Sequence, residues 1–249
     1  MRVELRLRWL WLPASLAIVF LLRHHKLALV AYVVAVLLGL IVWLVVLPRR
    51  AALAERTFHR DALRRLAAED HAGVEALAAR QWLIRRFGRR FVLPDMLGLV
   101  ATARGDHEAA HRHYLEALKL APPGDRERIE LNLAAAELAT GRLDAAEGRY
   151  RAILARRADL QPALANLGRT LLRKGEELAE AADLLARALE RADRREAGGL
   201  HLARAEALAR AGRPGWRSAL DAAQTEEALG PGDAERITAL ASAHGAPSD

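Results

Sequence analysis

A self-similarity within residues 91–197 constrains the fold more than any other feature of the sequence. The glycines Gly105, Gly141 and Gly175 follow one another at intervals of 36 and 34 residues. A period of this length is the signature of stacked supersecondary units. Other positions recur in phase with the glycines, namely Leu97-Gly98, Leu133-Ala134 and Leu167-Gly168 before them and Ala117-Leu118, Ile153-Leu154 and Ala188-Leu189 after them. We therefore expect three repeated helix pairs, in which each first helix ends at its glycine.

A small residue and a ring also recur after the first two glycines, as Ala110 with Tyr114 and Ala146 with Tyr150. The third unit has Ala181 and Leu185 in these places, displaced by one residue. We expect the small residues where two helix backbones cross closely and the rings between successive units. This pattern resembles the tetratricopeptide repeat (TPR) family, and Pro122 matches the family's terminal proline. The resemblance implies an all-α solenoid whose concave face binds a protein or peptide.

Weaker copies flank the three units. Upstream, Gly73, Ala78 and Trp82 repeat the spacing of Gly105, Ala110 and Tyr114, which predicts a degenerate first unit within residues 59–90. Downstream, Leu208 and Gly212 begin a weaker repeat or capping helices over residues 198–232. After Pro231-Gly232 we expect one short helical turn, in a tail that covers residues 233–249.

A second constraint is the run from Leu27 to Leu47, which has 21 consecutive uncharged residues. As a helix it rises about 31 Å, the thickness of the hydrocarbon core of a bilayer. A shorter apolar stretch precedes it and spans too if Arg6 and Arg8 snorkel towards the headgroups. We therefore predict a membrane anchor over residues 1–48, built as a hairpin of helices at about 5–22 and 27–47. A buried core helix and a signal peptide are the alternatives, but no small-x-small cleavage site follows the apolar stretch.

The positive charge is concentrated near these apolar segments. Residues 1–50 have seven basic side chains against the single acid Glu4, and residues 51–104 have ten arginines against six acids. This bias predicts that the C-terminal part lies on the cytoplasmic side of a bacterial inner membrane, below a multi-pass anchor. Residues 49–90 form a basic neck that we expect near anionic lipid headgroups, through Arg49, Arg50, Arg85, Arg86, Arg89 and Arg90. Few aromatic side chains interleave with these arginines, so nucleic acid is not the expected partner.

The segment His107-Glu108-Ala109-Ala110-His111 is a literal HExxH motif, in which two histidines one helical turn apart bind zinc and the glutamate acts as a general base. His113, Glu127 or Glu130 is a conceivable third ligand. However, the motif begins the second helix of a repeat, where Ala110 and Tyr114 are needed for packing. We expect surface histidines here, and neither a metal nor another cofactor. The chain has no cysteine, which excludes disulfides and thiolate metal sites.

Two asparagines, Asn132 and Asn166, lie 34 residues apart at the same repeat position. An amide donates and accepts at once, which suits a peptide bond. The TPR resemblance implies that both face the groove, together with Arg128, Arg169 and Arg173. The full carboxylate clamp of chaperone-binding members is not reproduced, since the first unit has Asp95 and Leu99 at the relevant places.

These expectations combine into a membrane-anchored TPR scaffold, not an enzyme, which holds a protein or peptide partner at the cytoplasmic face of the membrane. The architecture is similar to that of HemY-type inner-membrane TPR proteins. Two alternatives stay open at this point. One is a structural subunit of an envelope complex that assembles through the hairpin, and the other is a zinc-dependent membrane protease that uses the HExxH motif.

Overall fold

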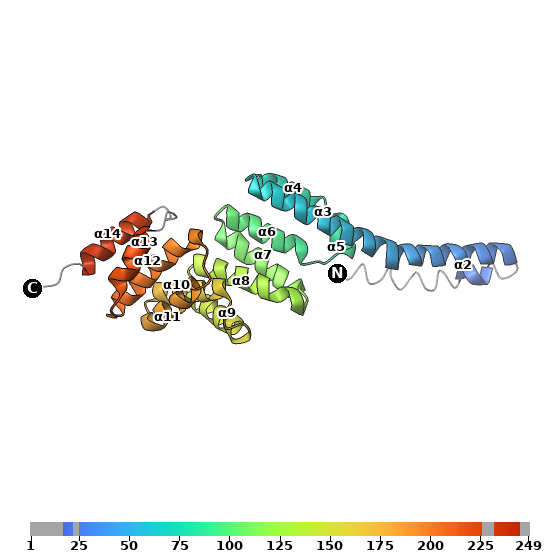
Figure 1. Ribbon diagram of the computed structural model, residues 1–249. Coiled ribbons are helices and arrows are strands. Elements are labelled where there is room, and N and C mark those ends of the chain that lie inside the picture. Colours follow the sequence, from blue (N-terminus) through green and yellow to red (C-terminus); the bar gives the residue numbers. More distant parts are fainter. Residues whose placement is uncertain (1–16, 22–24, 226–231, 245–249) are drawn as a thin grey trace, which may run out of the picture. The chain divides into compact units, whose positions relative to one another are not determined.

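The computed structural model describes residues 17–21, 25–225 and 232–244, and within these ranges it is all-helical, without strands (Figure 1). This confirms the all-α prediction. The chain divides into two compact units. The first contains the described residues up to Arg60 together with Arg80–Arg89, and the second contains Asp61–Ala79 and the described residues from Arg90 onwards.

One continuous helix makes up most of the first unit, and its last residues, from Asp61, belong to the second. It consists of α2 (Lys26–Ile41), a π-helical segment η1 (Val42–Val46) and α3 (Leu47–Ala67). The uncharged run ends at Leu47, and the helix passes through Pro48 into the arginine-rich residues that follow. A proline has no N–H to donate, and its ring clashes with the carbonyl four residues earlier. The wider π turn directly before Pro48 is the usual way in which a helix accommodates such a disruption.

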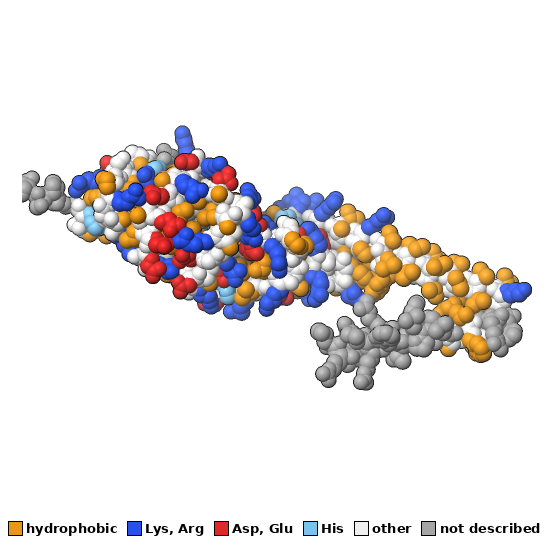
Figure 2. All heavy atoms as spheres, turned by 90° about the horizontal axis from the view of Figure 1, so that it is seen from below, with side chains coloured by type: hydrophobic (Ala, Val, Ile, Leu, Met, Phe, Trp, Pro, Cys, Tyr) orange, Lys and Arg blue, Asp and Glu red, His pale blue; other side chains and the backbone are white. Residues whose placement is uncertain are grey.

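The apolar part of this helix has no core around it. None of the residues of α2 is buried, and the exposed side chains include Leu27, Val30 and Leu37. Figure 2 shows hydrophobic side chains along this helix. This is the one helix in the described ranges that is long and apolar enough to cross a membrane. Of the other span expected at 5–22, only residues 17–21 are described, and they are helical; the turn at 22–24 lies outside the described residues.

The second unit is a succession of helices in which each one from α6 to α13 packs against the next (Figure 1). α14 packs against α12, and α4 against α6. Short connections and an Ala- and Leu-rich core hold these helices together. The helices of this unit after α3 are α4 (His71–Ala79), α6 (Val92–Ala103), α7 (His107–Leu120), α8 (Pro123–Ala139), α9 (Leu143–Arg156), α10 (Gln161–Lys174), α11 (Leu178–Leu189), α12 (Arg194–Arg210), α13 (Trp216–Thr225) and α14 (Asp233–His244).

Within the described ranges, the same turn ends five helices. Gly105, Gly141, Gly175 and Gly212 all have φ between +65° and +78°, which confirms the predicted left-handed glycines. In each turn the next residue donates its N–H to a carbonyl five residues back, as Asp106 does to Ala101 at 2.9 Å. This is the Schellman motif, which satisfies the last carbonyls of a helix. The fifth turn follows α3 and has Glu69 in the glycine position, at φ 57°.

Helices cross closely at the small residues, as the sequence predicts. A Cβ atom at Gly98 would lie 2.5 Å from the ring of Tyr114, and one at Gly168 would lie 2.7 Å from Cγ of Leu185. Tyr114, Tyr150 and Leu185 are all fully buried. The third unit has one extra residue after its glycine, since α11 begins three residues after Gly175, whereas α7 and α9 begin two residues after Gly105 and Gly141. This insertion accounts for the displacement of Ala181 and Leu185.

Two expectations about the flanking segments are wrong. Gly73 does not end a helix but lies inside α4, and Trp82 is not a buried ring but is 66% exposed at the start of α5 (Trp82–Phe87). The upstream turn is instead made by Glu69, so the predicted register was incorrect. The C-terminal segment is also more ordered than a single turn, because α14 runs for 12 residues and buries Ile237 and Leu240.

Candidate functional site

The five predicted partner-binding residues lie on two helices that contact each other. Arg128 and Asn132 belong to α8, and Asn166, Arg169 and Arg173 belong to α10. Their surroundings differ. Arg128 and Arg173 bind neighbouring helices through their side chains. Asn132, Asn166 and Arg169 are half-buried.

Arg128 is engaged in an ion pair with the preceding helix. Its two terminal nitrogens donate to both carboxylate oxygens of Asp95 in α6, at 3.0 and 2.5 Å. The hydrogen bonds to Asp95 raise the pKa of Arg128. The ring of Tyr114 lies close by, with its hydroxyl 3.2 Å from Oγ1 of Thr102, and burial raises the pKa of Tyr114 to about 12. Arg128 therefore links α8 to α6, because a bidentate pair with a buried carboxylate is strong and directional.

Arg173 also contacts the fold itself. It donates to the carbonyl of Leu138 at 2.6 Å, near the end of α8. Arg210 makes the same bond to the carbonyl of Leu172 at 2.9 Å, near the end of α10. Both arginines stand two residues before the glycine of their unit, and each donates to a carbonyl in the last turn of the preceding helix, which also accepts a hydrogen bond from the glycine that caps that helix. Their repeated role is to fasten one helix pair to the next.

Asn166 and Arg169 lie together on α10. The guanidinium of Arg169 donates to Oδ1 of Asn166 at 3.2 Å, and the Asn166 side chain is next to the buried Tyr150. Burial lowers the pKa of Arg169, and within the described residues no carboxylate lies within ion-pair distance of this arginine. Glu196, Asp233 and Arg236 surround it at longer range. A half-buried guanidinium without a carboxylate partner retains the capacity to bind an acidic group.

Asn132 occupies on α8 the repeat position that Asn166 has on α10. Its side chain is half-buried, and among the described residues it forms no side-chain hydrogen bond. Three of the five predicted residues, Asn132, Asn166 and Arg169, thus form the candidate site. The other two support it: Arg128 holds α8 against α6, and Arg173 holds α10 against α8.

The HExxH residues are engaged in contacts between repeats. Glu108 accepts a hydrogen bond from Arg142 at 2.8 Å, and this bond lowers the pKa of Glu108, whereas a general base working near neutral pH needs a raised one. Nε2 of His111 lies 3.7 Å from the buried carboxylate of Glu137, which Arg149 also binds, at 2.8 and 2.9 Å. In the described ranges no group of three or more His, Asp or Glu side chains is placed to hold a metal ion.

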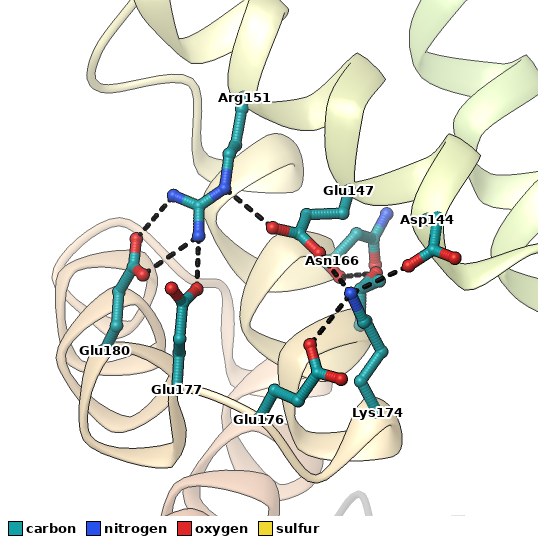
Figure 3. Close-up of polar contacts among 9 residues, drawn as sticks. Asp144, Glu147, Arg151, Asn166, Lys174, Glu176, Glu177 and Glu180 are labelled. Carbon is teal, nitrogen blue, oxygen red and sulfur yellow. Dashed lines mark hydrogen bonds and ion pairs between the residues drawn. The ribbon is translucent and has the colours of Figure 1, made fainter.

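A dense ion-pair network connects α9, α10 and α11 (Figure 3). Arg151 binds Glu147 at 2.9 Å, Glu180 at 2.8 Å and Glu177 at 2.5 Å. Lys174 shares Glu147, at 2.8 Å, and also binds Asp144 at 2.8 Å and Glu176 at 3.0 Å. Glu177 has φ 46°, a strained conformation for a residue with a side chain, and Arg151 binds it there. The network stabilises the turn that contains the extra residue.

Two of the predicted basic residues of the neck, Arg86 and Arg89, make contacts with the long helix in the first unit. The rings of Trp43 and Phe87 meet edge to face, with centroids 4.9 Å apart, and the guanidinium of Arg86 lies 4.8 Å above the Trp43 ring. Arg89 donates from both its backbone N–H and its side chain to the buried carboxylate of Glu55, the latter at 2.8 Å. The other predicted arginines, Arg49, Arg50, Arg85 and Arg90, are exposed, and Arg90 belongs to the second unit.

Comparison with known proteins does not supply a family: no protein-family model matches this sequence, and no curated protein matches it. The contacts above include several that sequence reasoning missed. The pairing of Asp95 with Arg128 has no signal in the repeat, because Asp95 replaces an apolar residue. Glu69 had a signal, since it lies 36 residues before Gly105, but its side chain concealed the equivalence. The stacking of Trp43 with Phe87 joins segments that are distant in sequence.

Proposed function

We propose that this protein is a membrane-anchored TPR-like scaffold that binds a segment of a partner protein over α8 and α10. The observation that carries the proposal is the pair Asn132 and Asn166. These amides occupy equivalent positions on neighbouring helices, and Arg169, beside the second, has no carboxylate within ion-pair distance among the described residues. Equivalent amides on successive repeats suit the regular spacing of peptide groups along an extended chain. Arg169 would take an acidic side chain of the same segment.

The anchor in this proposal is the apolar part of the long helix. None of the residues of α2 is buried and most of its side chains are exposed, and the helix continues directly into α3. We further propose that residues 5–22 complete a membrane hairpin, and that the excess of arginine after Pro48 keeps the second unit on the cytoplasmic side. Tethering a partner in this way raises its effective concentration at the membrane.

The proposal is tested by crosslinking and affinity capture from native membranes. The comparison is between the wild type and the double variant Asn132→Ala, Asn166→Ala. A matched control is Arg112→Ala, Glu116→Ala, which removes two exposed polar side chains from α7. Helicity, melting temperature and abundance are measured for all three proteins so that a folding defect is recognised.

The expected result is that one defined partner disappears with the asparagine variant and persists with the control. Adding Arg169→Gln should weaken capture further if the partner contributes an acidic side chain, since a bidentate carboxylate contact is lost. An identical set of captured proteins in all variants would contradict a binding site on α8 and α10. If removal of residues 1–47 then abolished capture, assembly would proceed through the membrane segment instead.

A further inference from the structure

The short helix α5 is joined to the long helix of the first unit rather than to the helices beside it in sequence. Two contacts hold it there, one at Trp43 and the other at Glu55. The second contact is close, because a Cβ atom at Gly88 would lie 2.5 Å from Oε1 of Glu55. Ile84, on the same short helix, is fully buried.

The first contact determines how deep α5 lies in a membrane. Trp43 stands four residues before Leu47, the last residue of the uncharged run, and so about 6 Å inside the end of that run. If this run spans the bilayer, Trp43 is in the interfacial zone where tryptophan is enriched. Phe87 and Arg86 touch Trp43 and are therefore at the same depth.

The charge and exposure of this region match the headgroup layer. Residues 48–60 and 80–89 contain eight arginines and one acid, Glu55, which is buried against Arg89. On and just before α5, the side chains of Arg80, Trp82 and Arg85 are exposed. Trp82 is 66% exposed, more than any other exposed aromatic side chain in the described part of the chain. An exposed tryptophan flanked by arginines is typical of a segment that lies in a membrane surface.

We propose that α5 is an interfacial helix, with Trp82 embedded at headgroup level and Arg80 and Arg85 bound to anionic phospholipids of the membrane that α2 crosses. This inference rests on the proposed membrane anchor. It adds a second point of membrane contact, separate from the spanning helix. The long helix fixes the depth of α5 through Trp43 and Glu55, and the arginines supply the attraction to negative charge.

The test is fluorescence quenching in lipid nanodiscs that hold the intact protein. The lipids have bromine atoms either near the headgroup or deep in the acyl chains. Subtracting the emission of Trp82→Phe from that of the wild type isolates Trp82. Subtracting the emission of Trp216→Phe from that of the wild type isolates Trp216 on α13 in the same way. This tryptophan belongs to the second unit and is the matched control. We expect strong quenching of Trp82 by the shallow bromines, weaker quenching by the deep ones, and none of Trp216.

A second measurement tests the lipid charge. We expect phosphatidylglycerol to increase the quenching of Trp82 in the wild type, and Arg80→Gln, Arg85→Gln to abolish that increase. Each arginine near an anionic surface changes the equilibrium constant for binding of α5 to the membrane surface by about fivefold. These two arginines are chosen because Arg86 and Arg89 hold α5 in place. The control Arg194→Gln, Arg195→Gln removes the same charge from exposed positions of the second unit and should leave the quenching unchanged.

A Trp82 component as insensitive to bromine as that of Trp216 would overturn the inference, and so would quenching that is indifferent to anionic lipid. Resistance of the protein to alkaline extraction from membranes is measured in parallel. A protein that resists extraction but shows no Trp82 quenching refutes the interfacial helix alone. A protein that extraction releases refutes the anchor itself, and the proposed function with it.

Discussion

At the scale of single residues, three helical glycines have very different surroundings. A Cβ atom at Gly98 would meet the Tyr114 ring at 2.5 Å, and one at Gly168 would meet Leu185 at 2.7 Å. At Gly148, in the middle of α9, nothing lies within 4 Å of such an atom. The first two glycines are required by packing, and the third is not.

This difference predicts opposite effects of one substitution. Gly98→Ala and Gly168→Ala should each destabilise the protein by about 1–3 kcal/mol, because neither the Tyr114 ring nor the branch point of Leu185 can move aside without disturbing the core. Gly148→Ala should stabilise it by about 0.5–1 kcal/mol through helix propensity. Chemical denaturation in detergent, followed by helicity, measures all three. Equal effects at the three positions would contradict the close crossings.

Residues also show how far the sequence could be read. The leucine and small-residue pairs predicted the crossings, because the absence of a side chain is visible in a sequence. The partners of Arg128 and Arg173 could not be predicted, since Asp95 and the Leu138 carbonyl are brought near them only by the packing of neighbouring helices. Of the five predicted residues, the packing therefore leaves three available to a partner, and these form the candidate site.

At the scale of elements, the five equivalent turns differ in one residue. Four have glycine in the left-handed position, and the turn after α3 has Glu69 at φ 57°. The left-handed conformation costs a residue with a Cβ atom about 1 kcal/mol or more of conformational energy. Glutamate is not the residue expected in a left-handed turn, so the repeat pattern pointed to Gly73 and Trp82 instead and the turn at Glu69 was not predicted.

We therefore expect Glu69→Gly to stabilise the protein, by less than about 1 kcal/mol because glycine also gains freedom in the unfolded chain. The reciprocal control is Gly105→Ala, at φ +76°, which should destabilise it by about 1 kcal/mol. Melting temperatures of the two variants and the wild type give the comparison. A loss of stability in Glu69→Gly would mean that the glutamate side chain has a role of its own.

The network across α9, α10 and α11 predicts a pH dependence. The hydrogen bonds from Lys174 and Arg151 lower the pKa of Glu147, and the bond from Arg151 lowers that of Glu180. Their contribution to stability is thus complete above the usual pKa of 4.5 and is lost as the pH falls through the lower folded values. The pKa of Lys174 is raised by its three carboxylates, so its contribution is lost only at a pH above its usual 10.5.

Melting temperature as a function of pH should therefore be flat near neutrality and fall below about pH 4.5. In Glu147→Gln the plateau should be lower by about 2–4 °C, and the acid fall should be smaller. The control is Glu116→Gln, whose exposed side chain has no part in the network. If the plots of melting temperature against pH for the wild type and Glu147→Gln stayed parallel at acid pH, this would contradict a contribution of the network to stability.

At the scale of the whole chain, the helices of the second unit contact mainly their sequence neighbours. Such contacts are typical of repeat architectures, in which stability is a sum of local and nearest-neighbour contributions. The sequence could predict this much because every unit repeats the same apolar positions. It could not predict the extent of α14, where no repeat remained to compare, nor the place of α5, which is determined by rings far apart in the chain.

Local coupling predicts where a destabilising change is felt. Gly168→Ala should increase amide hydrogen exchange in α10 and α11 and in the adjoining α9 and α12, while α6 and α7 keep their protection. Gly98→Ala should do the reverse. Hydrogen exchange with peptide resolution measures both. A uniform increase throughout the unit in either variant would indicate that it unfolds as one cooperative body.

The π-helical segment before Pro48 has a geometric consequence for the first unit. A π turn holds one residue more than an α turn, so it offsets the angular phase of every later residue by about 100° relative to an unbroken α-helix. Trp43 lies within this segment and Glu55 beyond it, and both meet α5. The two contact points share one face only at this phase. Removing one residue from the segment would restore an α turn and keep the two contact points on one face, whereas inserting one residue between Pro48 and Glu55 would turn Glu55 about 100° away from Arg89 and leave α5 attached only at Trp43.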